Sequence, residues 1–168
     1  MQIRFETTHD VDQIHRLNHS AFGTTAEADL VDALRRVAQP FISLVAEQDH
    51  IIAGHIVFSA VTLSADPDVR IAGLGPMSVT PALQRRGIGS ALVRAGLDEC
   101  RRFGFVAVAV LGHREFYPRF GFSPASRCGI SSTYDVPDDV FMMLELEPGA
   151  LRGKRGVIQY HAAFSGVS

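Results

Sequence analysis

Hydrophobic and polar residues follow two different periods along the chain, and together they predict an α/β fold. Stretches rich in β-branched and aromatic residues predict strands at residues 3–5, 41–47, 51–63, 70–79, 105–111, 140–147 and 156–164. Apolar residues spaced three and four apart predict helices at residues 11–22, 24–37 and 88–103. A further short helix is expected at about 114–120, directly before Gly121 and Phe122.

Turn and stop signals between these elements support the order. Polar residues 48–50 separate two β-rich stretches and predict a hairpin. Thr24 and Glu27 match a capping box that would open the second helix. Gly104 stands where a left-handed residue would end the third helix. Residues 105–111 are nearly all apolar, which is typical of a strand buried on both faces at the centre of a sheet.

Composition narrows the class of protein. The 168 residues suit a single domain, expected to span 1–168 with its core in 2–147 and a last strand at about 156–164. A net charge of −2 argues against a general nucleic-acid or membrane-surface binder. No apolar run approaches the ~20 residues needed to span a bilayer.

The N-terminus and the cysteines favour the cytoplasm. The first ten residues include Arg4, Glu6 and Asp10 instead of the apolar region of a signal peptide. Cys100 and Cys128 form neither a disulfide framework nor a zinc pattern. We therefore expect a cytoplasmic protein with two structural thiols and no bound metal.

The candidate chemistry concentrates in the turn at residues 84–90, Gln-Arg-Arg-Gly-Ile-Gly-Ser, which joins a predicted strand to a predicted helix. The first amides of a helix have no intrahelical acceptor, and the helix dipole adds partial positive charge, so this turn suits an anion. Gly87 and Gly89 let phosphate oxygens approach the backbone, and Arg85 and Arg86 add charged, forked donors.

Two common phosphate-binding motifs do not match this turn. A Walker loop requires a lysine directly after its second glycine, and no lysine follows either glycine here. The dinucleotide fingerprint requires a third glycine, where Leu92 stands, and an acidic residue about 20 positions later that this chain lacks.

The spacing Gln84-x-x-Gly87-x-Gly89 resembles instead the pyrophosphate motif Q/R-x-x-G-x-G/A of the GNAT N-acetyltransferase superfamily. Residues 73–79 (GLGPMSV) resemble the strand that runs alongside pantetheine, and residues 116–122 (FYPRFGF) resemble the family's F-Y-x-x-x-G-F run. These segments look most like the YhbS-like branch of predicted acetyltransferases. The resemblance implies the GNAT acyl-CoA N-acyltransferase fold, a mixed α+β sheet in the order β-α-α-β-β-β-α-β-α-β-β.

The resemblance also implies acetyl-CoA (coenzyme A) as cosubstrate. In the family two central strands part, pantetheine lies in the gap, and backbone amides matching Met77 and Val79 bind it and polarise the thioester carbonyl. The residues expected to bind the cofactor are Met77, Ser78, Val79, Gln84, Arg85, Arg86, Gly87, Ile88, Gly89 and Ser90.

Tyr117 matches the family's usual general acid, which assists the departing CoA thiolate. A phenol has a pKa of about 10 and a thiol about 8.5, so a hydrogen bond to the developing thiolate is favoured over full proton transfer. Pro118 disfavours helical geometry at Tyr117, which leaves the hydroxyl open to displacement.

The base that deprotonates the acceptor amine stays open. Many relatives place a glutamate on the strand at 70–79, where this chain has no carboxylate. His55, His113, Glu27 or water remain as candidates. Each side chain also has a structural alternative: His55 as a core histidine, His113 as a helix cap, and Glu27 as a member of the capping box.

The function implied by the resemblance is N-acetyl transfer to a primary amine of an unidentified acceptor, small molecule or protein, by direct attack in a ternary complex. Neither cysteine has the surroundings of a nucleophile, which disfavours an acyl-enzyme. A non-catalytic acyl-CoA-binding sensor is the alternative: Tyr117 favours the enzyme, and the missing carboxylate favours the sensor. We expect a monomer or a homodimer.

Overall fold

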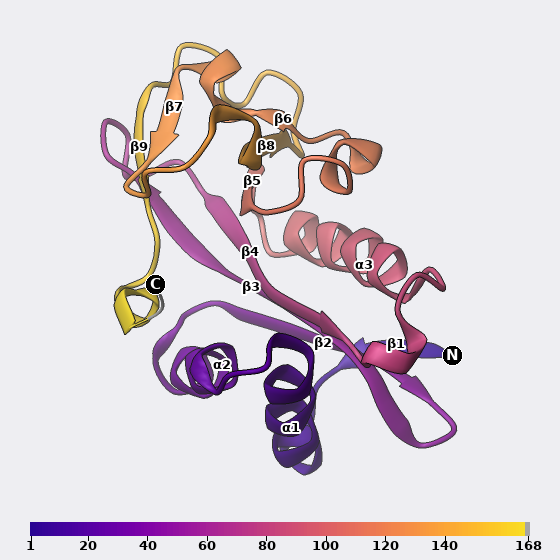
Figure 1. Cartoon of the computed structure of the whole chain (residues 1–168). Coiled ribbons are helices and arrows are strands. Elements are labelled where there is room, and N and C mark those ends of the chain that lie inside the picture. Colours follow the sequence, from indigo (N-terminus) through magenta and orange to yellow (C-terminus); the bar gives the residue numbers. More distant parts are fainter. Residues whose placement is uncertain (167–168) are drawn as a thin grey trace.

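The computed structural model describes residues 1–166, which form a mixed sheet with helices on both faces (Figure 1). The strands are β1 (Gln2–Phe5), β2 (Phe41–Gln48), β3 (Ile51–Leu63), β4 (Ile71–Val79), β5 (Ala107–Leu111), β6 (Ser123–Pro124), β7 (Ile130–Ser132), β8 (Phe141–Glu145) and β9 (Gly156–Gln159). The α-helices are α1 (Val11–Phe22), α2 (Ala26–Val37) and α3 (Ile88–Arg102). In this range no helix combines the length and the apolar character needed to cross a bilayer.

The centre of the sheet is a short parallel pairing that ends early. The strand order is β1-β2-β3-β4-β5-β8-β6, and β4 and β5 are the parallel neighbours in it. Their register ends at the pair Leu74–Val110, whereas β4 continues to Val79 beside β3 alone. A bulge between Leu74 and Met77 adds a residue to β4 and bends it. The two strands therefore part in the middle of the sheet.

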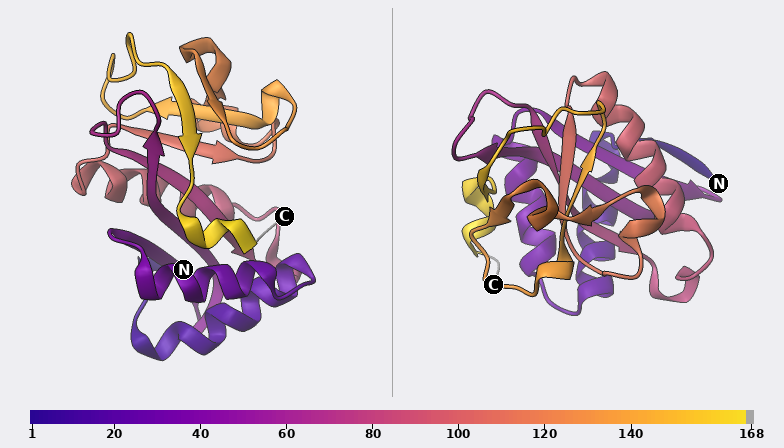
Figure 2. Two further views of the ribbon diagram at one scale, coloured as in Figure 1. Left: turned by 90° about the vertical axis from the view of Figure 1, so that its left-hand side faces the viewer. Right: turned by 90° about the horizontal axis from the view of Figure 1, so that it is seen from above.

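The two faces of the sheet have different covers (Figure 2). Helix α3 covers one face, where Val108 and Val110 of β5 contribute to the core. On the other face α1 and α2 cover the first strands, and β7 and β9 cover the part around β5, where Ala107 and Ala109 point. The segment after β9 connects the two groups of elements on this face. It runs from β9 to the 3₁₀ helix Ala162–Gly166, which packs against α2.

Several local predictions are confirmed. Asp49 and His50 form the turn of the β2–β3 hairpin, both with positive φ. Helix α3 ends where expected: Gly104 has a φ of 84°, and its amide donates to the carbonyl of Arg101 at 3.0 Å.

The predicted short helix at 114–120 is wrong. The segment holds only the 3₁₀ turn Tyr117–Phe120, with Pro118 near its start. The amides of Phe116 and Tyr117 both donate to the carbonyl of His113. Proline lacks an amide donor and disfavours the α conformation of the residue before it, so a regular helix cannot form here.

Other boundaries also differ from the prediction. Helix α2 begins at Ala26, and the Thr24 hydroxyl donates to the Glu27 carboxylate at 3.2 Å instead of capping the backbone, so the predicted capping box is wrong. The strand predicted at 156–164 is β9, which ends at Gln159. The strand predicted at 140–147 is β8, which is shorter at both ends, Phe141–Glu145. Strands β6 and β7 were not predicted, because two and three residues are too few to show alternation.

Candidate active site

The turn at 84–90 leads directly into α3. Gly87 occupies the N-cap position with a φ of 89°, and Arg85 also has a positive φ of 64°. Backbone turns of this kind direct amides toward one side and create a concave site for an anion. The carbonyl of Gly87 accepts from the Ala91 amide at 3.0 Å, whereas the amides of the first turn of α3 have no intrahelical acceptor.

The side chains of the turn fall into two groups: Gln84 fixes the turn to β4, and Arg85 and Arg86 are exposed hydrogen-bond donors. The Nε2 of Gln84 donates to the carbonyl of Val79 at 3.1 Å, which ties the turn to the end of β4. Arg85 and Arg86 are exposed, so their guanidinium groups are accessible to a charged ligand. The turn is therefore both anchored and positively charged.

The end of β4 presents backbone amides to the gap left by β5. The Thr80 amide donates to the carbonyl of Ala53 at 2.8 Å, so it points toward β3. Successive amides of a strand point to opposite edges, so the amides of Met77 and Val79 point away from β3, into the gap. The Val79 carbonyl also points away from β3, because it accepts a hydrogen bond from the Gln84 side chain on that edge of β4.

Gly89 is the point where the turn, β4 and the segment after β5 meet. A Cβ atom at Gly89 would lie 3.7 Å from Met77 Cε, 3.7 Å from Phe116 Cζ and 3.9 Å from Val79 Cγ2. The side chains of Met77 and Val79 therefore face α3, whereas that of Ser78 faces the opposite side. The three segments singled out by the family resemblance are thus adjacent in space.

Tyr117 is buried beside the gap, with 5% of its surface exposed. Its ring makes edge contacts with Phe116 and Phe122 at centroid distances of 5.0 and 5.6 Å. The ring also lies against Gly112, directly after β5, where a Cβ atom would be 2.6 Å from Tyr117 Cε2. Burial raises the pKa of Tyr117 to about 12. Despite Pro118, the ring is held in the core and the phenol is neutral.

His55, one candidate base, belongs to a buried polar chain. The chain links Arg35, Glu6, Ser43, His55 and Asn18. Ser43 donates its single proton to the Glu6 carboxylate, so His55 Nε2 must donate to Ser43 Oγ, at 2.8 Å. His55 Nδ1 then accepts from Asn18 Nδ2 at 3.3 Å. Burial lowers the pKa of His55, and both ring nitrogens are occupied.

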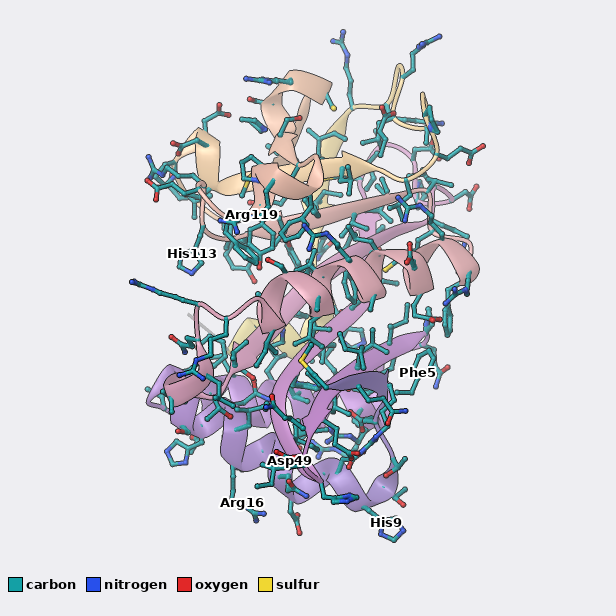
Figure 3. All side chains as sticks on the ribbon, turned by 90° about the vertical axis from the view of Figure 1, so that its right-hand side faces the viewer. Phe5, His9, Arg16, Asp49, His113 and Arg119 are labelled. Atoms are coloured by element: carbon teal, nitrogen blue, oxygen red, sulfur yellow. The ribbon has the colours of Figure 1, made fainter. Side chains whose placement is uncertain are left out.

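The other two candidate bases lie elsewhere. Glu27 is half-buried on α2 and accepts from Thr24. His113 follows β5 and projects from the surface (Figure 3), while its backbone carbonyl accepts from the segment at Tyr117. The structure therefore does not bring the three candidates together, and it shows His55 in a structural network.

Two other polar features lie apart from these segments. A surface hollow of about 660 Å³ contains none of the predicted site residues. Its cationic lining residues are Arg127, Arg152, Lys154 and Arg155. On α1 and α2, His15, Asp29 and Asp32 offer ligand atoms within 4.8 Å of one another, but His15 already bonds Asp32 at 2.8 Å. Neither feature includes a residue of β4 or of the turn at 84–90.

Sequence patterns did not single out a group of side chains with buried polar atoms on the face opposite α3. It includes Ser59 of β3 and Tyr160, which follows β9. The available signal was alternation: Ile158 faces the core, so Tyr160, two residues later, continues on the same side.

Comparisons with known proteins agree with this architecture. The model of the acetyltransferase (GNAT) domain family matches residues 2–125. The chain is 35% identical over 153 residues to YjhQ of Escherichia coli (strain K12), covering 86% of this chain and 84% of that protein. It is 32% identical over 166 residues to YhbS of the same strain, covering 98% and 99%. Both relatives are described as uncharacterized N-acetyltransferases.

Solved structures give the same result. The crystal structure of YhbS from Escherichia coli in complex with CoA matches with a TM-score of 0.91 at 32% identity, covering 98% of this chain and 91% of that chain. A GNAT family acetyltransferase from Brucella melitensis in complex with acetyl-CoA matches with a TM-score of 0.80 at 36% identity, covering 97% of each chain. The predicted family and its YhbS-like branch are confirmed: the chain belongs to the GNAT family of acetyltransferases.

Proposed function

We propose that the chain transfers the acetyl group of acetyl-CoA to a primary amine by direct attack in a ternary complex. The observation that carries this proposal is the gap between β4 and β5, into which the amides of Met77 and Val79 point beside the turn at Gly87 and Gly89. Two relatives that match nearly the whole chain were solved with CoA and with acetyl-CoA, which supports the same cosubstrate here.

The turn binds the pyrophosphate of the cofactor in this proposal. Residues 84–90 supply backbone amides at the start of α3, and Arg85 and Arg86 supply charge. Pantetheine then lies along β4, where the Met77 amide donates to the thioester carbonyl. Such a donor is typically worth about 3–4 kcal/mol of transition-state stabilisation.

Tyr117 assists the leaving group. With a pKa of about 12, the phenol stays protonated and can donate a hydrogen bond to the departing thiolate. Complete proton transfer would be uphill, because a thiol ionises at about 8.5. The sulfur therefore leaves as a hydrogen-bonded thiolate and takes its proton from solvent.

The two cysteines support direct transfer over an acyl-enzyme. Cys100 is fully buried on α3, and burial raises its pKa to about 12. Burial and the nearby Glu145 raise the pKa of Cys128. Neither thiol provides the thiolate that nucleophilic catalysis requires.

A thiol-release assay tests the proposal against the sensor alternative. Purified protein is incubated with acetyl-CoA and each of a lysine amide, spermidine, phenethylamine and an α-amino peptide. We expect amine-dependent CoA release, with the acetylated amine identified by mass spectrometry. Tight acetyl-CoA binding without turnover on any amine would support the sensor instead.

A further inference from the structure

Four buried side-chain atoms have no hydrogen-bond partner within residues 1–166, and they share one side of the sheet. These atoms are Asn18 Oδ1, Ser59 Oγ, Ser78 Oγ and Tyr160 OH. Alternation along β3 and β4 places Ser59 and Ser78 on the face opposite α3, where α1 carries Asn18 and the C-terminal segment carries Tyr160. A buried polar atom without a partner costs about 1–3 kcal/mol, so each of these atoms calls for a ligand or a water molecule as its partner.

Tyr160 reaches across this face from the end of β9. The pair Thr62–Gln159 holds β9 to β3, so Tyr160 leaves the strand beside β3. Its ring lies over Gly73 of β4, where a Cβ atom would be 2.9 Å from Tyr160 Cε1 and 3.3 Å from Cδ1. The hydroxyl end of the ring is therefore the closer end, because Cε1 is bonded to the carbon that bears the oxygen. Gly73 directly precedes Leu74, where β4 and β5 part.

Tyr117 approaches the same gap from the other face. Its ring packs in the core beneath α3, whereas Tyr160 packs against the core on the opposite side. Burial, and then the charges that Tyr134 and Tyr117 would carry if ionised, raise the pKa of Tyr160. Both phenols are therefore neutral at neutral pH. Tyr160 lies over Gly73 and Tyr117 lies against Gly112, so the two rings flank, from opposite faces, the place where β4 and β5 part.

We propose that Tyr160 is the acceptor-side residue of the acyl-transfer site, and that its hydroxyl binds the nitrogen of the attacking primary amine. This inference rests on the proposed function, which places the thioester in the gap. The cofactor turn and Tyr117 lie on the α3 side, so the amine attacks from the opposite face. The Tyr160 hydroxyl has a free acceptor there, which takes an N–H of the neutral amine and directs the nitrogen lone pair at the carbonyl carbon.

The reaction balances without a further reactant. The amine nitrogen forms a C–N bond with the acetyl carbon, the C–S bond breaks, and its electron pair stays on sulfur. The nitrogen loses one proton to solvent, and the thiolate gains one, so the products are an N-acetyl amine and CoA. Tyr160 contributes orientation and is not consumed, ionised or acylated.

The test is Tyr160→Phe, which keeps the ring over Gly73 and removes one oxygen. That oxygen has no protein partner, so the melting temperature should stay the same or rise. The acetyl-CoA dissociation constant should also stay the same. For the best amine of the panel, kcat/KM should fall roughly 10-fold or more, the loss expected for one hydrogen bond made to the reacting nitrogen.

Tyr134→Phe is the matched control. Tyr134 contacts Tyr160 ring to ring at 5.8 Å, and the change removes the same atom from a neighbouring phenol that has no assigned part in the reaction. Its kinetics should match the wild type. Equal kcat/KM for Tyr160→Phe and wild type would overturn the assignment and leave the acetyltransferase proposal intact. A wild-type protein that acetylates no amine would overturn both.

Discussion

Burial and hydrogen bonding assign different roles to Tyr117 and His55, two candidate catalytic residues of the sequence. Tyr117 is a phenol in an apolar setting with its pKa raised to about 12, so it can donate but does not ionise at neutral pH. His55 is an imidazole with both nitrogens occupied, and burial lowers its pKa. Tyr117 is therefore suited to donate a hydrogen bond to a leaving group, whereas His55 is suited to link α1 to the sheet.

Tyr117→Phe tests the donor directly. The substitution keeps the contacts with Phe116 and Phe122 and removes the hydroxyl, so stability and acetyl-CoA affinity should change little. Turnover should fall ~10²–10⁴-fold, the usual range for a positioned acid, and the loss should appear in kcat instead of KM. Steady-state thiol release measures both constants.

The pH profile gives a second check on the same residue. The protonated phenol is the donating form, and it persists below its pKa of about 12. Wild-type kcat should therefore not fall between about pH 8 and 10, where a free phenol would begin to ionise. Unchanged kcat in Tyr117→Phe would mean that CoA leaves without help and that Tyr117 is only a core aromatic.

At the scale of elements, the N-terminus of α3 is the feature with the clearest chemical consequence. Gly89→Val places a branched side chain where the turn, Met77 and Phe116 meet. The nearest atoms are at ordinary contact distance, so the fold should persist. The added methyl groups should block the approach of phosphate, and calorimetry should show acetyl-CoA affinity lower by about 10-fold or more.

Gly89→Ala is the control for this change, because the family motif accepts alanine at the corresponding position. It should bind acetyl-CoA with near wild-type affinity. If Gly89→Val also binds normally, the turn does not hold the pyrophosphate.

The elements that could be predicted from sequence were those in which many residues follow a single helical or strand pattern of hydrophobicity. Helix α3, the β2–β3 hairpin and the buried strand β5 each carry a long pattern and a turn or stop signal, such as Gly104. The helix predicted at 114–120 did not form because Pro118 lacks the amide hydrogen that a regular helix needs. Strands β6 and β7 are too short to produce a pattern.

The site was predictable where it is local and not where it depends on tertiary contacts. Residues 84–90 form one continuous turn, so their type and spacing identified it. Whether the Met77 and Val79 amides are left without a strand partner depends on where β5 ends, which no local pattern specifies. Tyr160 reaches Gly73 only through the pairing of β9 with β3, a contact between distant segments.

At the scale of the whole molecule, ligand binding should raise the stability of the assembled fold. The proposed site draws on β4, the start of α3 and the segment after β5, so a bound cofactor links elements that unfolding would separate. A ligand at 100 times its dissociation constant adds about 2.7 kcal/mol to the free energy of unfolding. For a chain of 168 residues this corresponds to a rise of roughly 5–10 °C in melting temperature.

The comparison among ligands makes this measurement specific. Acetyl-CoA and CoA should both raise the melting temperature, since they share the pyrophosphate and pantetheine that the turn and β4 are proposed to bind. NAD and ATP at equal concentration should raise it much less, because the turn lacks the third glycine and the lysine that their usual motifs require. A larger shift with NAD would mean that the turn recognises a dinucleotide, and the acetyl-CoA assignment of the gap between β4 and β5 would then be wrong.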